Sequence, residues 1–201
     1  MTTLRSNTDF QDEVFTKLKL DRGRVDASMF QDCRFERCSF VEATLQSCRF
    51  QRCSFVDCDL SLVELSESVL ASVEFEASKL VGVDWTRSQS NRPALGKSTS
   101  FKSSNLNHGT FIGLDMQEAQ FIECAAREID FREANLSGAV FHETDLQGSL
   151  FMGTNLSGAD LRSARNYHID PTNNTLSQAR FSLPEAVSLL YALDIRLDED
   201  E

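Results

Sequence analysis

Bulky apolar residues recur at every fifth position along most of this chain. From Phe10 to Trp85 all sixteen positions of this spacing are apolar, and a second series, shifted by one residue, runs from Phe101 to Leu161. All 15 phenylalanines fall on these two series or on the continuation of the second at Phe181. A period of five fits neither an α-helix, with 3.6 residues per turn, nor a β-strand, with a period of two. The chain must therefore turn a corner every five residues.

A second inner position lies two residues before each of these centres, and it holds mostly small side chains such as Cys33 and Ala43. The other three positions hold nearly all the charged residues, and Glu13 is the only charge at an inner position within 8–85 and 99–161. Four sides of five residues would close a coil of twenty, so residues twenty apart should stack, ~4.8 Å from coil to coil. The columns agree with this closure, as in Phe15, Phe35, Phe55 and Phe75.

Two segments, 134–138 (Ala-Asn-Leu-Ser-Gly) and 154–158 (Thr-Asn-Leu-Ser-Gly), match the motif A(D/N)LXX closely. On this motif the chain resembles the pentapeptide-repeat proteins over about residues 8–181. The fold that the resemblance implies is all-β, a right-handed quadrilateral parallel β-helix. The repeats make about eight coils, which corresponds to a rod roughly 40 Å long at strand spacing.

The spacing of five is lost over residues 86–100. The chain therefore divides into N-terminal coils, this break, C-terminal coils, and a terminal helix with an acidic tail, over residues 1–85, 86–100, 101–181 and 182–201. The break is the only basic part, with a charge of +3. Two interpretations stay open. The break is either a kink that resets the ladder around Pro93, because proline cannot donate a ladder hydrogen bond, or a loop that contacts a partner.

The last part of the chain carries the signals of a helix. Ser182 and Glu185 form a capping-box pattern, and Pro184 is tolerated in a first turn. The apolar residues spread around much of this helix, so one face can cover the open end of the last coil and the remainder needs a second partner. A matching helix from a second subunit, around a two-fold axis, is the economical answer. The predicted homodimer interface comprises Leu183, Ala186, Val187, Leu189, Leu190, Leu193 and Ile195.

Several kinds of chemistry are not expected. The net charge of −11 argues against direct binding of nucleic acid. The N-terminus shows no apolar run of a secretory signal, and no stretch approaches the ~18 apolar residues of a spanning helix, so we expect a soluble, cytoplasmic protein without a membrane partner. The six cysteines all take the inner position, without C-x-x-C spacing, which predicts buried free thiols. His108, His142 and His168 do not cluster, so we expect no metal site, no cofactor and no enzymatic activity.

An acidic rod of this size approaches the dimensions of a short DNA segment, whose helical turn is ~34 Å. A duplex 40 Å long would carry about 23 negative charges, at one per ~1.7 Å. The rod carries −7 once its last four acids are set aside. Charge arrangement and shape must therefore contribute to any mimicry of DNA.

Within the family, the layout of the chain is similar to that of a topoisomerase-protecting subgroup, the Qnr quinolone-resistance proteins and the microcin- and albicidin-immunity proteins. The shared features are the Cys- and Phe-rich N-terminal coils, the exit at 83–85 into an out-of-phase insert, and the ending over residues 166–170 and 179–186. The resemblance implies a DNA mimic that binds DNA gyrase through its A subunit, with topoisomerase IV as a second partner, and relieves poisoning by a drug or toxin.

The candidate partner-binding residues are basic side chains of the break and outward acids beside it, namely Arg87, Arg92, Lys97, Glu64, Glu67, Asp84, Asp115 and Glu118. The alternative is an interaction scaffold with no topoisomerase role. Fold and acidity do not separate the two hypotheses, because function resides in sites and not in folds.

Overall fold

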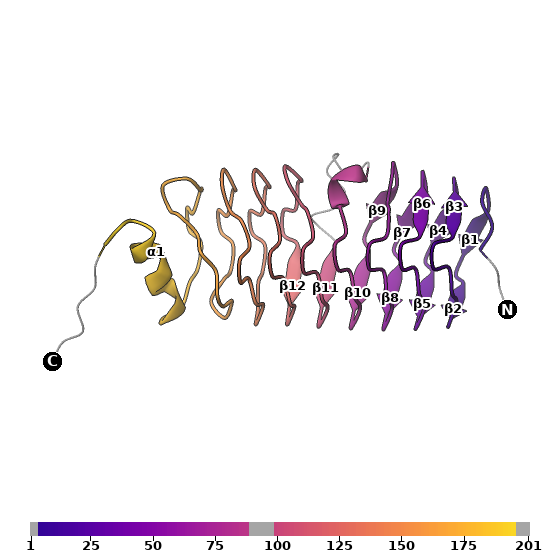
Figure 1. Ribbon diagram of the computed structural model, residues 1–201, viewed down its shortest axis with the longest axis horizontal. Helices are drawn as coiled ribbons and strands as arrows, with labels where there is room; N and C mark the ends of the chain where they lie inside the picture. Colours follow the sequence, from indigo (N-terminus) through magenta and orange to yellow (C-terminus); the bar gives the residue numbers. More distant parts are fainter. Residues whose placement is uncertain (1–3, 89–98, 196–201) are drawn as a thin grey trace.

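The chain forms an elongated stack of coils, with its two ends at opposite ends of the rod (Figure 1). The computed structural model describes residues 4–88 and 99–195. Every named strand is three residues long, and every strand pairing is parallel. The strands are this short because the chain turns a corner every five residues.

Three sheets run along the rod. The largest contains, in chain order, β2 (Val14–Thr16), β5 (Arg34–Glu36), β8 (Ser54–Val56), β10 (Glu74–Glu76), β11 (Ser100–Lys102) and β12 (Gln120–Ile122). The second contains β1 (Asp9–Gln11), β4 (Met29–Gln31), β7 (Arg49–Gln51) and β9 (Val69–Ala71). The third contains β3 (Arg24–Asp26) and β6 (Thr44–Gln46).

The register of the ladders confirms the coil of twenty residues. Phe10 pairs with Phe30, and Phe15 pairs with Phe35. The pairings fall into four sets five residues apart, which begin at residues 9, 14, 19 and 24 and join residues 29, 34, 39 and 44. The handedness of the coil stays a prediction.

The number of regular turns is smaller than expected. Six strands in the largest sheet span five turns, not the eight coils that the repeat count predicts. Beyond β12 the same ladder continues as isolated bridges, from Gln120 to Val140, then to Asp160 and to Arg180. The repeats after β12 therefore stack without forming regular three-residue strands.

The ladders continue past the break with a changed offset. Phe75 pairs with Phe101, a separation of 26 residues, and Phe101 then pairs with Phe121 at the usual twenty. One coil therefore holds six additional residues. A short 3-10 helix, η1 (Trp85–Arg87), begins the break. Residues 89–98, with Pro93, lie outside the described residues, so the kink and the loop both stay predictions.

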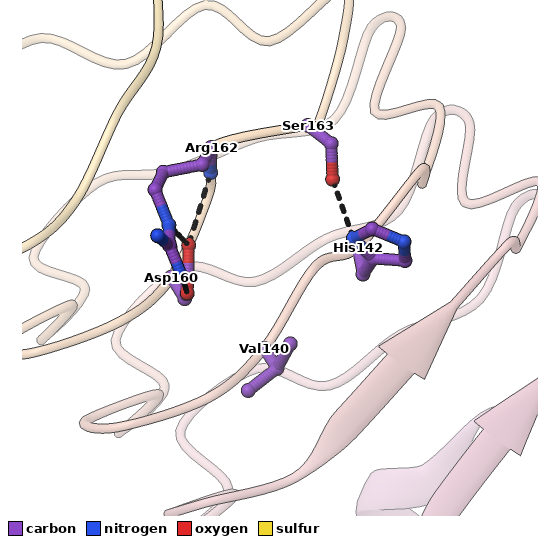
Figure 2. A pocket seen from close by; sticks show the side chains of 5 residues that line it. All are labelled: Val140, His142, Asp160, Arg162 and Ser163. Atoms are coloured by element: carbon purple, nitrogen blue, oxygen red, sulfur yellow. Dashed lines mark hydrogen bonds and ion pairs between the residues drawn. The ribbon is translucent and has the colours of Figure 1, made fainter.

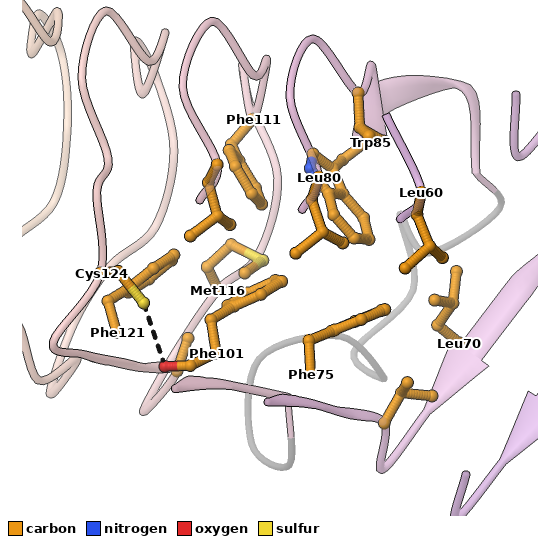
Figure 3. Packing of buried hydrophobic residues seen from close by; sticks show 14 of the residues in the cluster. Leu60, Leu70, Phe75, Leu80, Trp85, Phe101, Phe111, Met116, Phe121 and Cys124 are labelled. Carbon is orange, nitrogen blue, oxygen red and sulfur yellow. Dashed lines mark hydrogen bonds between the residues drawn. The ribbon is translucent and has the colours of Figure 1, made fainter. Parts of the chain in front are cut away.

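The core is a set of stacked aromatic columns. Phe75, Phe101 and Phe121 lie one behind another, with ring centroids 5.3 and 5.2 Å apart (Figure 3). Trp85 stacks on Phe111 in the neighbouring column at 5.4 Å and meets the first column edge to face. Offset stacks and edge-to-face contacts are the favourable geometries of aromatic pairs. The five-residue series is therefore the buried interior of the rod.

The small inner positions are also buried. All six cysteines are free and buried, which confirms the prediction of core thiols. Burial raises the pKa of the Cys53 thiol to about 11 and that of Cys124 to about 11. Each thiol donates a hydrogen bond to the carbonyl of a central residue 23 positions earlier in the chain, as from Cys53 Sγ to the Phe30 carbonyl at 3.3 Å. These side chains are therefore hydrogen-bonding groups as well as small fillers.

The C-terminal helix is shorter than expected and is not capped as predicted. A 3-10 turn, η3 (Glu185–Val187), leads into one α-helical turn, α1 (Ser188–Tyr191). The capping box is wrong, because Glu185 accepts a hydrogen bond from the backbone N–H of Asn166 and η3 has no side-chain cap. The carboxylate thus ties the helical segment to the preceding coil.

Candidate partner-binding surface

A shallow hollow lies where the N-terminal coils meet the break. Its volume is about 480 Å³. Arg87 Nη1 lies 3.6 Å from Glu64 Oε1, and Arg87 Nε lies 3.3 Å from Asp84 Oδ2. The structure therefore brings together three of the predicted partner-binding residues. The hollow is lined by Glu42, Thr44, Leu62, Val63, Glu64, Gly82, Asp84 and Arg87.

The register of the coils explains this grouping. Glu64 and Asp84 occupy the same outward position in successive coils, and their bridges join Thr44 and Thr110 respectively. Asp84 Oδ1 accepts hydrogen bonds from the N–H of Thr86 at 3.1 Å and from its hydroxyl at 2.6 Å. These bonds start η1, and the helical turn aims Arg87 back at the two acids.

Gly82 forms part of the wall of the hollow and lies against Leu62 of the preceding coil. Gly82 has φ +69°, and a Cβ there would lie 2.7 Å from Leu62 Cδ2. The leucine side chain, which is 52% exposed, therefore lies over the glycine of the next coil. The hollow combines an apolar wall with acidic groups, a surface that suits the stem and charge of a basic side chain.

Glu67 lies at the adjacent corner of the coil. Its Oε2 accepts a hydrogen bond from Ser47 Oγ at 2.9 Å, and its backbone N–H donates to the Arg87 carbonyl at 2.9 Å. Glu64 and Glu67 are both exposed. The three acids beside the break thus form one surface with the arginine that contacts them. This surface is here called the acidic corner and is defined as Glu64, Glu67, Asp84 and Arg87.

The remaining predicted residues do not join the acidic corner. Asp115 belongs to another ladder, where it accepts a hydrogen bond from Asn135 Nδ2 at 3.2 Å. Neither Asp115 nor Glu118 lines the hollow. Arg92 and Lys97 lie outside the described residues. Proximity in sequence to the break therefore does not place an acid at this surface.

A second hollow of about 240 Å³ was not predicted from the sequence. Its residues are Val140, His142, Asp160, Arg162 and Ser163 (Figure 2). Ser163 Oγ lies 2.8 Å from His142 Nδ1, and the Arg162 guanidinium forms two parallel bonds to Asp160, which hold the pKa of that carboxyl below its usual range. The twenty-residue coil could have predicted part of this hollow, because residues 142 and 162 share one position in successive coils.

The serine and histidine of this second hollow have the residue types of a nucleophile and a base. Ser163 Oγ, however, already accepts a hydrogen bond from the Glu143 N–H at 3.0 Å. The side chains of His142 and Glu143 are 53% and 60% exposed, so water surrounds them. A site for acyl transfer needs donors preorganised for an oxyanion in a water-excluded pocket, and this open hollow provides no such enclosure.

The C-terminal end exposes the predicted dimer residues unevenly. Leu183 is 78% exposed. The exposed fractions of Leu190, Leu193 and Ile195 are about half of that value. Ala186, Val187 and Leu189 are half-buried, and Leu189 packs against the core of the rod. Tyr191, at 58% exposure, extends the apolar surface and was missed in the sequence pattern.

Within residues 4–88 and 99–195, no three His, Cys, Asp or Glu side chains gather as a metal-binding group. In the same part of the chain, no helix has the length and apolar character needed to span a membrane.

Solved structures share this fold at low sequence identity. HetL of the cyanobacterium Nostoc sp. strain PCC 7120, a pentapeptide repeat protein involved in heterocyst differentiation regulation, matches with a TM-score of 0.64 and 18% identity over 90% of this chain and 89% of its own. Full-length QnrB1, a plasmid-mediated fluoroquinolone resistance protein, matches with a TM-score of 0.58 and 18% identity over 93% of this chain and 100% of its own. Likeness at this level shows the fold alone.

No curated protein matches the sequence. A family model described as a pentapeptide repeat region matches residues 28–111 and 83–161. These matches overlap, cover well over half of the chain and coincide with the stacked coils. The protein therefore belongs to the pentapeptide-repeat family.

Proposed function

We propose that this protein binds DNA gyrase and protects it from a topoisomerase poison. The observation that carries the proposal is the match with the whole length of QnrB1, which is described as a fluoroquinolone resistance protein. An acidic chain with a net charge of −11 also suits a target that normally holds DNA. The role needs binding and no catalysis, and it belongs in the cytoplasm.

The finer form of the proposal is a right-handed, four-sided rod that mimics DNA on the A subunit of gyrase, with topoisomerase IV as a second partner. The microcin- and albicidin-immunity proteins are the subgroup it would join. The acidic corner provides a candidate contact because Glu64 and Glu67 are exposed and lie on one surface.

The proposal is tested in a supercoiling and cleavage assay of DNA gyrase, with and without a fluoroquinolone or albicidin. We expect the protein to reduce poison-stabilised cleavage, or to inhibit supercoiling when no poison is present. Absence of any effect, together with absence of binding to gyrase, would contradict the proposal.

Charge reversal at the acidic corner is expected to weaken the action on gyrase. In the double variant Glu64→Lys, Glu67→Lys we expect the effective concentration in the gyrase assay to rise about tenfold, because two attractive contacts become repulsive. The matched control is Glu74→Lys, Glu76→Lys, which changes the net charge equally on the exposed positions of β10. Equal effects of the two double variants would remove the acidic corner from the proposal.

We also propose a homodimer through the C-terminal apolar surface. Leu183, Leu190, Tyr191, Leu193 and Ile195 are exposed there, and an apolar patch of this kind marks an interface. We expect Leu190→Asp to halve the mass measured by sedimentation equilibrium, because the variant places a charge in the interface. Leu62→Asp, on an exposed leucine elsewhere, is the control. A wild-type protein that is already monomeric would refute the dimer.

The second candidate function is a scaffold without a topoisomerase role. It is favoured by the similarity to HetL, which is described as involved in the regulation of differentiation. A protein that folds and dimerises normally but leaves gyrase unaffected would support this function.

A further inference from the structure

The first described coil contains a charge where every later coil has a small or apolar group. Glu13 occupies an inner position, and its carboxylate makes no hydrogen bond or ion pair within the described residues. Glu13 is exposed, whereas the residues at the same position of the following coils are buried as far as Ala159, and Ala179 in the last coil is half-buried. The buried residues are Cys33, Cys53, Val73, Thr99, Ala119, Ala139 and Ala159.

Glu13 lies at a sheet edge. It precedes β2, which is the terminal strand of the largest sheet, and β1 is the terminal strand of the second sheet. The Glu13 carbonyl accepts the N–H of Arg34 at 2.9 Å, so this side of the chain pairs with the next coil. Within residues 4–88 and 99–195, no strand pairs with the other side of β1 or β2. Unpaired edges of this kind are templates for association with another chain.

Apolar surface accompanies this edge. Phe10 and Leu20 are only half-buried, whereas Phe30 and Phe40, one coil further along, are 0% and 1% exposed. The opposite end of the rod is different, because η3 and α1 lie beyond its last coil and Leu189 packs against the core (Figure 1). An edge-to-edge contact between two copies is therefore available at the β1 and β2 end alone, among the described residues.

We propose that Glu13 prevents two copies of this protein from joining through their β1 and β2 edges. Such a contact would join like ends around a two-fold axis, and the same residue of each copy would enter one interface. Two carboxylates of like charge would then lose water without gaining a partner, which is a large unfavourable contribution to association. Inward-pointing charges are a known means of blocking sheet edges.

The test is sedimentation of Glu13→Ala over a range of protein concentrations. The experiment uses the Leu190→Asp background, so that association through the C-terminal surface does not contribute. We expect the weight-average mass to double relative to the Leu190→Asp parent as concentration rises. Asp12→Ala is the matched control, because it removes the same charge from the neighbouring exposed corner, and we expect it to keep the mass of the parent.

Two further variants keep the proposal falsifiable. Glu13→Lys retains a charge at the edge and is expected to stay at the mass of the parent. Glu13→Gln removes the charge with little change of shape, and it replaces Glu13→Ala if circular dichroism shows that the alanine variant is unfolded. The proposal is overturned if both neutral variants keep the mass of the parent, or if Asp12→Ala or Glu13→Lys associates to the same extent.

Discussion

Replacing Phe121 by alanine is expected to lower the free energy of unfolding by about 3–5 kcal/mol. The side chain is fully buried, and its ring stacks between those of Phe101 and Phe141 at 5.2 and 4.9 Å. It also meets Phe111 and Phe131 edge to face. Because each coil contacts only its neighbours, more distant coils cannot move in to fill the cavity that the alanine variant leaves. Chemical unfolding followed by circular dichroism measures the loss.

The control for this prediction is Phe121→Leu, since leucine occupies the same type of position at Leu136 and Leu156, where it is fully buried. We expect a loss of about 1.5 kcal/mol or less for this smaller change of volume. If alanine and leucine cost the same, the aromatic column contributes nothing beyond filling space. If alanine lowers the free energy of unfolding by less than about 1 kcal/mol, the coils around Phe121 repack to fill the cavity, and the stacked aromatic column does not determine stability there.

Most of the fold could be predicted from the sequence because its interior has a strict period. An apolar centre every fifth residue admits a coil of twenty, and the pairing of Phe15 with Phe35 is the register that such a coil requires. The family follows from the same repeats. The count of eight coils failed as a count of regular turns, because a repeat can stack through a single bridge, as at Val140, without forming a strand.

The C-terminal end was predicted less well, because its structure depends on tertiary contacts. Local sequence around Ser182 and Glu185 favours a capping box. In the folded chain the carboxylate of Glu185 binds the Asn166 N–H instead, from a coil that sequence spacing alone does not place beside it. The helical segment is accordingly a 3-10 turn followed by α1, not a long helix.

The acidic corner could be predicted in part for a similar reason. Glu64 and Asp84 are twenty residues apart, so the coil brings them together. Asp115 follows the break, where the ladder offset is 26 residues, and its position in the coil could not be read from distance along the chain. The role of Arg87 also depended on η1, a local helix that the five-residue period does not contain.

Thr144→Val is expected to lower the free energy of unfolding by about 2 kcal/mol, although it preserves the shape of the side chain. The buried Thr144 hydroxyl donates to the Phe121 carbonyl at 2.8 Å and accepts the Cys124 N–H at 3.3 Å. Valine would leave both backbone groups without this partner in the interior. The sequence pattern predicts a small side chain at this inner position, and the structure adds a hydrogen-bonding role for it.

The control, Thr144→Ser, keeps the hydroxyl and loses one methyl group, so we expect it to cost about 1 kcal/mol, less than the valine variant. Chemical unfolding ranks the two variants. The reverse order would mean that packing alone selects the inner residue. The expected order would explain why Cys, Ser and Thr occur there so often, since a thiol such as Cys58 Sγ accepts the Cys38 N–H at 3.3 Å in the same way. The column of small inner residues then provides a second set of hydrogen bonds between coils, independent of the backbone ladders.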